Sequence, residues 1–327
     1  MRKQSNKLTE ELPSLLLLLV CYGAFGSVTF FANQLGMMLS VALLVPVLVL
    51  HSSLQHEIIH GHPTKNEFAN DLLVFPPLGL FIPYLRFKDM HLAHHHDPCL
   101  TDPYDDPESN YRDPAVWSQL PKWRQVMEQF NNTLLGRMVL GPLISLFCLY
   151  QKDAKEIALG DGRILRSYLH HLAGILLVGA WWWEFSTLSL TAYVAAAYLA
   201  LSVLKIRTFL EHQAHERVAA RSVLIEDRGI FSLLFLNNNY HALHHACPKV
   251  VWHRLPKLYQ QRRDLLLKRN GGYWYWSYWS VFCLYLFRNK DPVPHPLMEA
   301  DGAKDLAQQD QQNPNLGQEL QAETVGP

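Results

Sequence analysis

This sequence of 327 residues has little cysteine and no pattern that would pair it. The five cysteines are odd in number and far apart, and no two form a Cys-x-x-Cys motif: Cys21, Cys99, Cys148, Cys247 and Cys283. The pattern therefore indicates neither a disulfide framework nor a zinc ribbon, and it suits a reducing compartment.

A net charge is also absent, because 29 Lys and Arg residues balance 29 Asp and Glu residues. A nucleic-acid-binding protein would carry a basic excess, so we do not expect nucleic acid as a partner. Residues 301–327 lack apolar blocks and are rich in Gln, Asp and Gly, and we expect a disordered tail there.

Several long apolar blocks carry little or no charge. Residues 13–32 are long enough to cross a bilayer, and the apolar run returns at 37–50 after a tip of four residues. We expect the second helix to continue through 52–54 into the first histidine group. Because one run follows the other at once, we interpret them as a retained membrane hairpin and not as a cleavable signal peptide. Two further runs, 168–185 and 188–204, form a second hairpin.

Other stretches are interrupted by proline or charge. Residues 71–85 contain three prolines and are too short to cross, so we expect a re-entrant or interfacial segment. Residues 133–150 include Arg137 and Pro142 and are predicted to be interfacial. Residues 101–123 are polar and rich in Asp and Pro, which favours an irregular cytosolic loop.

Lys and Arg are missing from both hairpin tips, 33–36 and 184–187. The positive-inside rule therefore predicts that both termini and every histidine cluster face the cytoplasm. The predicted fold is an all-α integral membrane protein, with four transmembrane helices in two hairpins and a cytoplasmic histidine-rich cap. Residues 1–12 would be the cytoplasmic N-terminus and 13–300 the membrane domain. A soluble all-α protein would have to bury four apolar runs that have no polar face.

Histidine is the residue present in excess, with 17 copies. Most lie in four motifs: H-E-I-I-H-G-H at 56–62, D-M-H-L-A-H-H-H-D at 89–97, E-H-Q-A-H-E-R at 211–217 and N-Y-H-A-L-H-H at 239–245. In a helix the i, i+3, i+4 spacing puts His91, His94 and His95 on one face, so we expect them to converge on one point. The alternative for this motif alone is a polar helix end with scattered histidines.

The histidine set favours metal binding. The first motif by itself matches the zinc-protease signature, with Glu57 as the base. However, a catalytic zinc needs about three protein ligands, and this set is larger. Two metals with four or five ligands each would use it, and the spacing does not name the metal because imidazole suits iron, copper, zinc and nickel. A metal transporter would instead place ionisable residues near the bilayer midplane, where these spans have almost none.

Three motifs in order resemble the histidine boxes of the membrane fatty acid desaturase/hydroxylase superfamily. They are H-E-I-I-H-G-H-P, H-L-A-H-H-H-D-P followed by T-D-P-Y-D-D-P-E-S, and N-N-N-Y-H-A-L-H-H. Their approximate spacing and the two hairpins agree with that superfamily over about residues 10–290. The resemblance implies a non-haem di-iron centre with O2 as co-substrate, which abstracts hydrogen from an unactivated C–H bond of a lipid chain.

The resemblance also implies which residues hold the two irons: His56, His60, His91, His94, His95, His212, His241, His244 and His245. Seven further residues are expected around these ligands: Glu57, His62, His96, Asp97, Glu211, His215 and Asn239. The three carboxylates would accept the second ring N–H of a ligand and so hold its tautomer. His62 and His96 would hydrogen-bond outside the ligand set, and His215 competes with His212 for one position. Asn239 would make a water-linked contact or cap a helix.

The activity expected from the resemblance is O2-dependent desaturation of a fatty acyl chain. Hydroxylation is the close alternative, because both reactions begin with the same hydrogen abstraction. Carotenoid oxygenation and oxidative decarboxylation to a terminal alkene remain open. Electrons would come from a separate ferredoxin-, rubredoxin- or cytochrome b5-like donor with its reductase. The expected location is a bacterial cytoplasmic membrane, with the site facing the cytoplasm.

Overall fold

The computed structural model describes residues 7–96 and 99–298. Regular structure within these residues is helical except for one pair of two-residue strands, so the all-α prediction is confirmed for them. Asp97 and the predicted tail at 301–327 lie outside the described residues.

The elements of the first half are, in chain order, α1 (Lys7–Phe30), α2 (Ala32–Leu35), α3 (Met37–Ile59), α4 (Glu67–Leu73), α5 (Tyr84–His96), α6 (Pro114–Gln119), α7 (Lys122–Asn131), α8 (Leu134–Val139) and α9 (Gly141–Ala158). Those of the second half are α10 (Gly162–Phe185), α11 (Leu190–Thr208), η1 (Val218–Ala220), β1 (Leu224–Ile225), α12 (Ile230–Leu234), α13 (His241–Ala246), η2 (Trp252–Arg254), α14 (Leu255–Arg269), β2 (Trp274–Tyr275) and α15 (Tyr278–Tyr285). The two strands pair in parallel.

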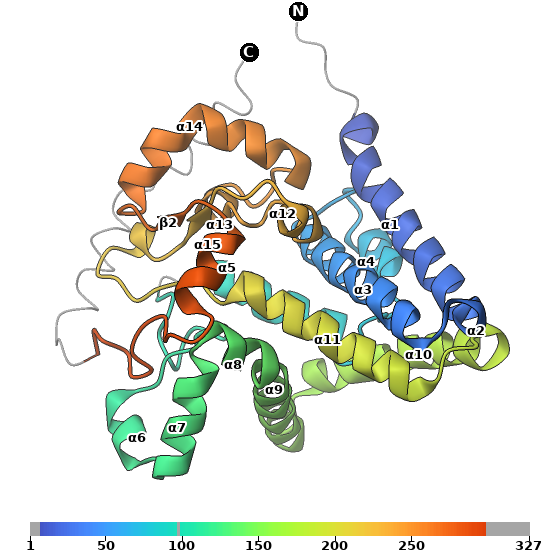
Figure 1. Cartoon of the computed structure of the whole chain (residues 1–327), viewed down its shortest axis with the longest axis horizontal. Coiled ribbons are helices and arrows are strands. Elements are labelled where there is room, and N and C mark those ends of the chain that lie inside the picture. Colours follow the sequence, from blue (N-terminus) through green and yellow to red (C-terminus); the bar gives the residue numbers. More distant parts are fainter. Residues whose placement is uncertain (1–6, 97–98, 299–327) are drawn as a thin grey trace, which may run out of the picture.

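The long helices form two hairpins whose tips lie together. Helices α1 and α3 are joined through α2, and α10 and α11 through a short turn beside it (Figure 1). The backbone N–H of Asn33 donates to the Thr187 hydroxyl at 3.1 Å, and the Thr187 N–H donates to the Thr29 carbonyl at 2.9 Å. Since α3 and α11 both start at these tips, both end at the opposite side of the molecule, where the histidines lie.

Three helices in the described part of the chain are long and apolar enough to cross a membrane, over Glu10–Phe30, Met37–Ile59 and Leu190–Thr208. Helix α3 runs unbroken into the first histidine group, as predicted. The predicted span 168–185 lies within α10, but α10 does not reach the same hydropathy, because His170, His171 and Glu184 interrupt its apolar residues. The fourth span stays a prediction.

Small residues bring α3 and α11 close together. Ala192, Ala196 and Ala200 recur every four residues on α11 and are at most 5% exposed, in the same core as Leu44 and Leu48 of α3. Small side chains allow helix backbones to approach closely, which is how membrane helices gain packing energy. This pair fixes the ends of α3 and α11 relative to each other.

Residues 74–83 are irregular, between the end of α4 and the start of α5. Their environment supplies the hydrogen bonds that a helix would otherwise make. The Tyr193 hydroxyl donates to the Leu78 carbonyl at 2.7 Å, and His171 Nε2 donates to the Leu80 carbonyl at 2.7 Å. Tyr22 does the same for Leu73 at 2.8 Å. Irregular backbone near lipid requires such partners from protein, which suits a re-entrant or interfacial segment.

One of two further segments differs from its prediction, and the interfacial position of the other, 133–150, stays a prediction. The polar loop predicted at 101–123 is interrupted by α6, because the Asp113 side chain accepts from the Ala115 N–H at 2.6 Å and Pro114 occupies the first turn. The apolar segment 133–150 is divided into α8 and α9 near Leu140, and Pro142 lies in the first turn of α9. Arg137 of α8 is buried.

The packing of α10 on the irregular segment predicts a stability difference between two glycines of one helix. A Cβ at Gly174 would lie 2.8 Å from the Phe75 carbonyl oxygen and 2.7 Å from Pro77 Cδ, whereas a Cβ at Gly179 would meet nothing within 4 Å. We expect Gly174→Ala to destabilise the protein by about 1–3 kcal/mol through overpacking. Thermal unfolding of the purified protein should show a lower midpoint for Gly174→Ala than for the wild type. The midpoint of Gly179→Ala should not be lowered. Equal midpoints would show that α10 does not pack here as described.

Candidate metal centre

The first histidine motif ends α3. His56 lies in the last turn of the helix, and His60 is its C-cap residue. Gly61 follows with a φ of +92°, a conformation that costs a glycine little and that commonly ends helices. The helix therefore stops directly after His60, with both histidines at its end.

The other motifs come from three separate segments. His91, His94 and His95 lie on α5, and the motif at 239–245 contributes the short helix α13 with its three histidines. His212 lies just beyond α11 in a bridge with Ser222. Four segments thus meet at one side of the α3–α11 pair.

Nine histidines form two groups in which the ring nitrogens lie within 4.8 Å of one another. The first group, here called group A, contains His56, His60, His91, His95 and His244. The second, here called group B, contains His94, His212, His241 and His245. Together they are the nine residues that the resemblance implied as iron ligands, and the groups have five and four members.

The expectation that His91, His94 and His95 converge on one point is wrong. His91 and His95 belong to group A, while His94 belongs to group B. The α13 triplet divides in the complementary way, with His244 in group A and the other two in group B. Successive residues of a helix are about 100° apart. An adjacent pair such as His94 and His95 therefore reaches two different points, and each triplet bridges both groups.

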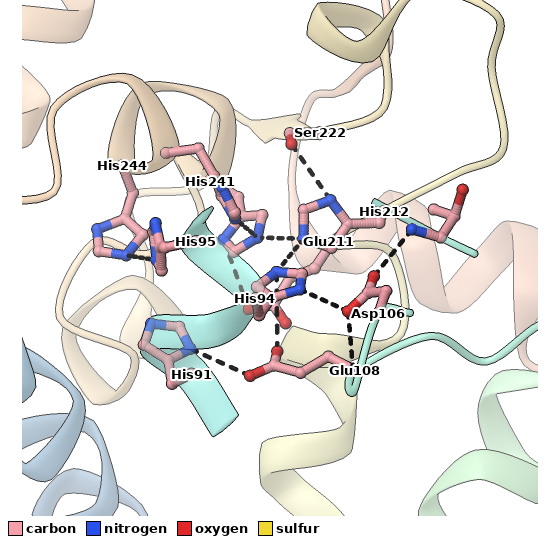
Figure 2. Close-up of polar contacts among 12 residues, drawn as sticks. His91, His94, His95, Asp106, Glu108, Glu211, His212, Ser222, His241 and His244 are labelled. Atoms are coloured by element: carbon pink, nitrogen blue, oxygen red, sulfur yellow. Dashed lines mark hydrogen bonds and ion pairs between the residues drawn. The ribbon is translucent and has the colours of Figure 1, made fainter. Parts of the chain in front are cut away.

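The Nε2 atoms are turned toward one another in both groups. In group A, Nε2 of His60 lies 3.1 Å from that of His91, and in group B Nε2 of His212 lies 2.9 Å from that of His94 and 3.0 Å from that of His241. Figure 2 shows the rings of His94, His212 and His241 joined by these contacts, from α5, the segment after α11 and α13.

The Nδ1 atoms point outward to polar partners. Nδ1 of His91 is 3.1 Å from Glu108, and Nδ1 of His94 is 2.8 Å from Asp106 (Figure 2). The Ser222 hydroxyl lies 3.2 Å from Nδ1 of His212. When Nδ1–H donates to a carboxylate, Nε2 carries the lone pair. This tautomer directs the ring lone pairs inward, toward the other imidazoles.

Burial keeps most of these imidazoles neutral. It lowers the pKa of His60, His212, His241, His244 and His245 well below the usual value, and neighbouring histidines add to the effect. Burial and the nearby His91 and His94 lower the pKa of His95 to about 3. Neutral imidazole is the form that binds metals.

His94 is the exception, because two carboxylates face it. Burial alone would lower its pKa, but Glu108 and Asp106 raise that pKa to about 9. Burial would likewise raise the pKa of Glu108, but His94 and His91 hold it below its usual range. Cationic charge is thus stabilised at the place where groups A and B meet.

The arrangement of these ring nitrogens suits metal binding better than it suits hydrogen bonds between the rings. Lone pairs that converge without a donor between them repel, and a cation removes that conflict. Nε2 of His56 is buried and has no hydrogen-bond partner, which costs free energy unless a ligand satisfies it. Two groups of all-imidazole donors with five and four members suit a first-row transition metal in each.

Of the residues predicted to surround the ligands, Glu211 lies beside a ligand, whereas Glu57, His62 and His96 bond elsewhere. Glu211 lies 3.6 Å from His241 Nδ1 and 3.0 Å from Arg207 Nε. The Glu57 carboxylate instead accepts the Trp252 backbone N–H at 3.0 Å. Nδ1 of His62 lies 2.9 Å from Glu11. The His96 ring donates to the Leu92 carbonyl, outside both groups.

The remaining two lie away from the nitrogens of both groups. His215 Nδ1 accepts the Arg217 N–H at 3.0 Å, so His212 and not His215 belongs to the histidine groups. Asn239 donates to the Ile225 carbonyl at 2.6 Å and does not cap α13, whose N-cap residue is Tyr240. Its neighbour Asn238 is the residue at 3.3 Å from His241 Nδ1.

Asp106 and Glu108 were not among the predicted residues. Both lie in T-D-P-Y-D-D-P-E-S, which was interpreted as an irregular loop. Asp106 also accepts the backbone N–H of Thr101 and of Glu108, so the loop folds around this carboxylate. The signal that could have identified them is two carboxylates, two residues apart, within the Asp-rich stretch that follows a histidine motif.

A comparison with known families agrees with this geometry. The family model described as fatty acid desaturase matches residues 15–277, and no individually curated protein matches the chain. The matched region contains all nine histidines and both helical hairpins. The chain therefore belongs to the fatty acid desaturase family.

Proposed function

We propose that this membrane protein catalyses the O2-dependent desaturation of a fatty acyl chain at a non-haem di-iron centre. The observation that supports it best is the inward convergence of nine imidazoles from four segments into two adjacent groups. Five histidines would hold one iron and four the other. When bound, the iron pair would supply the dioxygen-dependent removal of hydrogen from an unactivated C–H bond.

The chain itself would orient and insulate this chemistry. Asp106, Glu108 and Ser222 hold the Nδ1 atoms of three imidazoles and thereby fix the direction of each ring. Most of the imidazoles are neutral and none adds negative charge, so the metal pair would keep a strongly electrophilic character. His94 and His244 are buried, which shields these two ligands from bulk water.

A lipid substrate agrees with the position of the groups. They lie at the ends of α3 and α11, and both helices carry large exposed apolar residues such as Leu39 and Leu199. We further propose that residues 13–300 form the membrane domain and that the site faces the cytoplasm of a bacterial cell. A separate ferredoxin-, rubredoxin- or cytochrome b5-like protein would deliver the two electrons.

A zinc protease is supported less well. Its signature needs Glu57 as a free base, but that carboxylate is occupied by the Trp252 N–H. It would also leave most of the nine convergent histidines without a role. Hydroxylation of the same chain shares the initial hydrogen removal, so product analysis distinguishes it from desaturation.

The iron content of two variants at neighbouring histidines, His95 and His96, tests the ligand assignment. We expect purified protein to contain about two irons per chain and His95→Ala to lose most of this iron, because His95 lies in group A. His96→Ala should keep it, since that ring is half exposed and bonds to the Leu92 carbonyl. Metal analysis measures the content, and lipid profiles of the expressing host measure the activity.

The proposal fails if the protein holds a single zinc, or if lipid profiles with wild type and His95→Ala are the same across several acyl donors. Equal iron in the His95 and His96 variants would remove His95 from the ligand set.

The loop carboxylate Asp106 gives a second prediction. Asp106→Asn keeps the shape of the side chain but removes the charge that holds His94, so we expect about a 10–100-fold loss of iron affinity or activity. Asp105→Asn is the control, because Asp105 is exposed in the same loop. We expect the metal-free Asp106→Asn protein to unfold at a lower midpoint as well, because Asp106 also accepts two backbone N–H groups of its loop. A lowered midpoint without a change in iron affinity would make Asp106 a loop-folding residue only.

A further inference from the structure

The smaller of two cavities near the histidines adjoins group B. A cavity of about 470 Å³ lies between α5, α8, α9 and α11, and His212 and Glu108 form part of its wall. Its volume lies in the range of roughly 300–1,000 Å³ that is usual for small-molecule sites. The cavity is lined by six cationic and five anionic side chains, so its wall has one positive charge in excess.

The five carboxylates of this wall all have partners from the protein. These contacts are Asp106 with His94, Glu108 with His91, Glu128 with Arg112, Glu211 with Arg207 and Asp291 with Lys290. The carboxylates are therefore satisfied without the remaining cations of the wall.

Two of those remaining cations, Lys205 and Arg137, are drawn away from solvent: Arg137 is buried and Lys205 is half-buried. Lys205 Nζ donates to the Ser145 hydroxyl at 2.7 Å, and Arg137 donates to the Asn131 carbonyl at 2.9 Å and to Asn110. Within the described residues, neither one forms an ion pair with a carboxylate. Arg137 is 5% exposed, and burial lowers its pKa to about 10, so it still carries its charge at neutral pH.

Lys205 stands inside a candidate membrane span, in the last turn of α11. Charged residues in such segments are costly and usually face a partner or a functional cavity. A cation that is drawn away from solvent without an ion-pair partner is most simply retained because a ligand supplies the negative charge.

The larger cavity near the histidines does not show this pattern. It has a volume of about 1280 Å³ and touches His60, His95 and His245. Its buried cation Lys88 is paired with Glu67 and Asp71. The cations Lys249 and Lys257 on its wall are exposed, where water satisfies them.

Part of the remaining wall of the small cavity is apolar and adjoins the lipid-facing surface. Ile144 and Leu149 of α9 and Leu201 and Leu204 of α11 form part of its wall. The same turns of α9 expose Leu143 and Phe147. An amphipathic ligand with one anionic group and an apolar chain matches this lining, since the chain can enter along α9 and α11.

We propose that Lys205 and Arg137 form a carboxylate-binding site beside group B, and that the substrate is a free fatty acid. This inference rests on the proposed function, because it names the lipid class oxidised at that centre. A single carboxylate, which is ionised at neutral pH, would supply the anionic partner that neither cation has among the ion pairs of the described residues. A thioester or an ester lacks that charge at its acyl end.

Binding of hexadecanoic acid to the full chain in nanodiscs, after metal removal by chelation, tests the proposal. We expect the acid to bind roughly tenfold or more tightly than its methyl ester, because a charged group strengthens hydrogen bonds. Lys205→Met should reduce acid binding to the level of the ester, and Lys205→Arg should keep most of it. Lys152→Met is the matched control, because Lys152 belongs to the same wall but is exposed.

Three results would overturn the proposal. The first is equal affinity for the acid and the methyl ester in the wild type. The second is unchanged acid binding in Lys205→Met. The third is hexadecyl phosphate binding as tightly as the acid, which would assign the site to a phosphate.

Failure of this site can be separated from failure of the proposed function. Iron content and conversion of an acyl thioester are measured on the metal-loaded protein in parallel. If these persist while the acid does not bind, only the carboxylate site is wrong. If the acid binds but iron does not, the di-iron proposal is wrong and the cavity is a fatty acid site with another role.

Discussion

The opposite orientation of two ring nitrogens on each imidazole is the constraint on which the rest of the structure depends. An Nδ1–H that donates outward leaves the Nε2 lone pair directed inward, as at His91 beside Glu108 and His94 beside Asp106. Nine histidines place ring nitrogens close together in two groups, and a cation in each group would relieve the repulsion between their lone pairs. The packing of the helices behind them holds the rings in these positions.

That packing depends on the α3–α11 pair. Both helices start at the joined hairpin tips and run in the same direction, so His56, His60 and His212 arrive at one side. Alanines on α11 allow the close approach. The loops supply the remainder: α5 and α13 bring in the two triplets, and residues 101–109 fold around Asp106 to hold them.

Charge distinguishes the two cavities that reach the histidines. The larger is bordered by ion pairs and exposed lysines, whereas the smaller keeps Lys205 and Arg137 without counter-ions beside an apolar wall. An uncompensated buried charge is the more informative feature, because burial makes it expensive. The chemistry of group B thus depends on imidazoles, whereas recognition of its substrate depends on the cations Lys205 and Arg137.

The sequence by itself determined the helical hairpins, the continuation of α3 into the first motif and the nine histidines that gather at one site. Apolar run length and i, i+3, i+4 spacing are local properties and can be seen without a fold. They did not reveal that His94 and His95 belong to different groups, that α10 falls short of the hydropathy of the other three helices, or that Asp113 starts a helix within the predicted loop.

The tertiary structure alone decided the partners. Asp106 contacts His94, which lies 12 positions earlier in the chain, and Glu57, although next to His56, bonds to Trp252 nearly two hundred residues away. The tertiary structure also decided that Lys205 and Arg137 line one cavity. Neither forms an ion pair with a carboxylate of the described residues. Such pairings depend on how distant segments pack, and the direction of each side chain at the site follows from that packing and not from its neighbours in the chain.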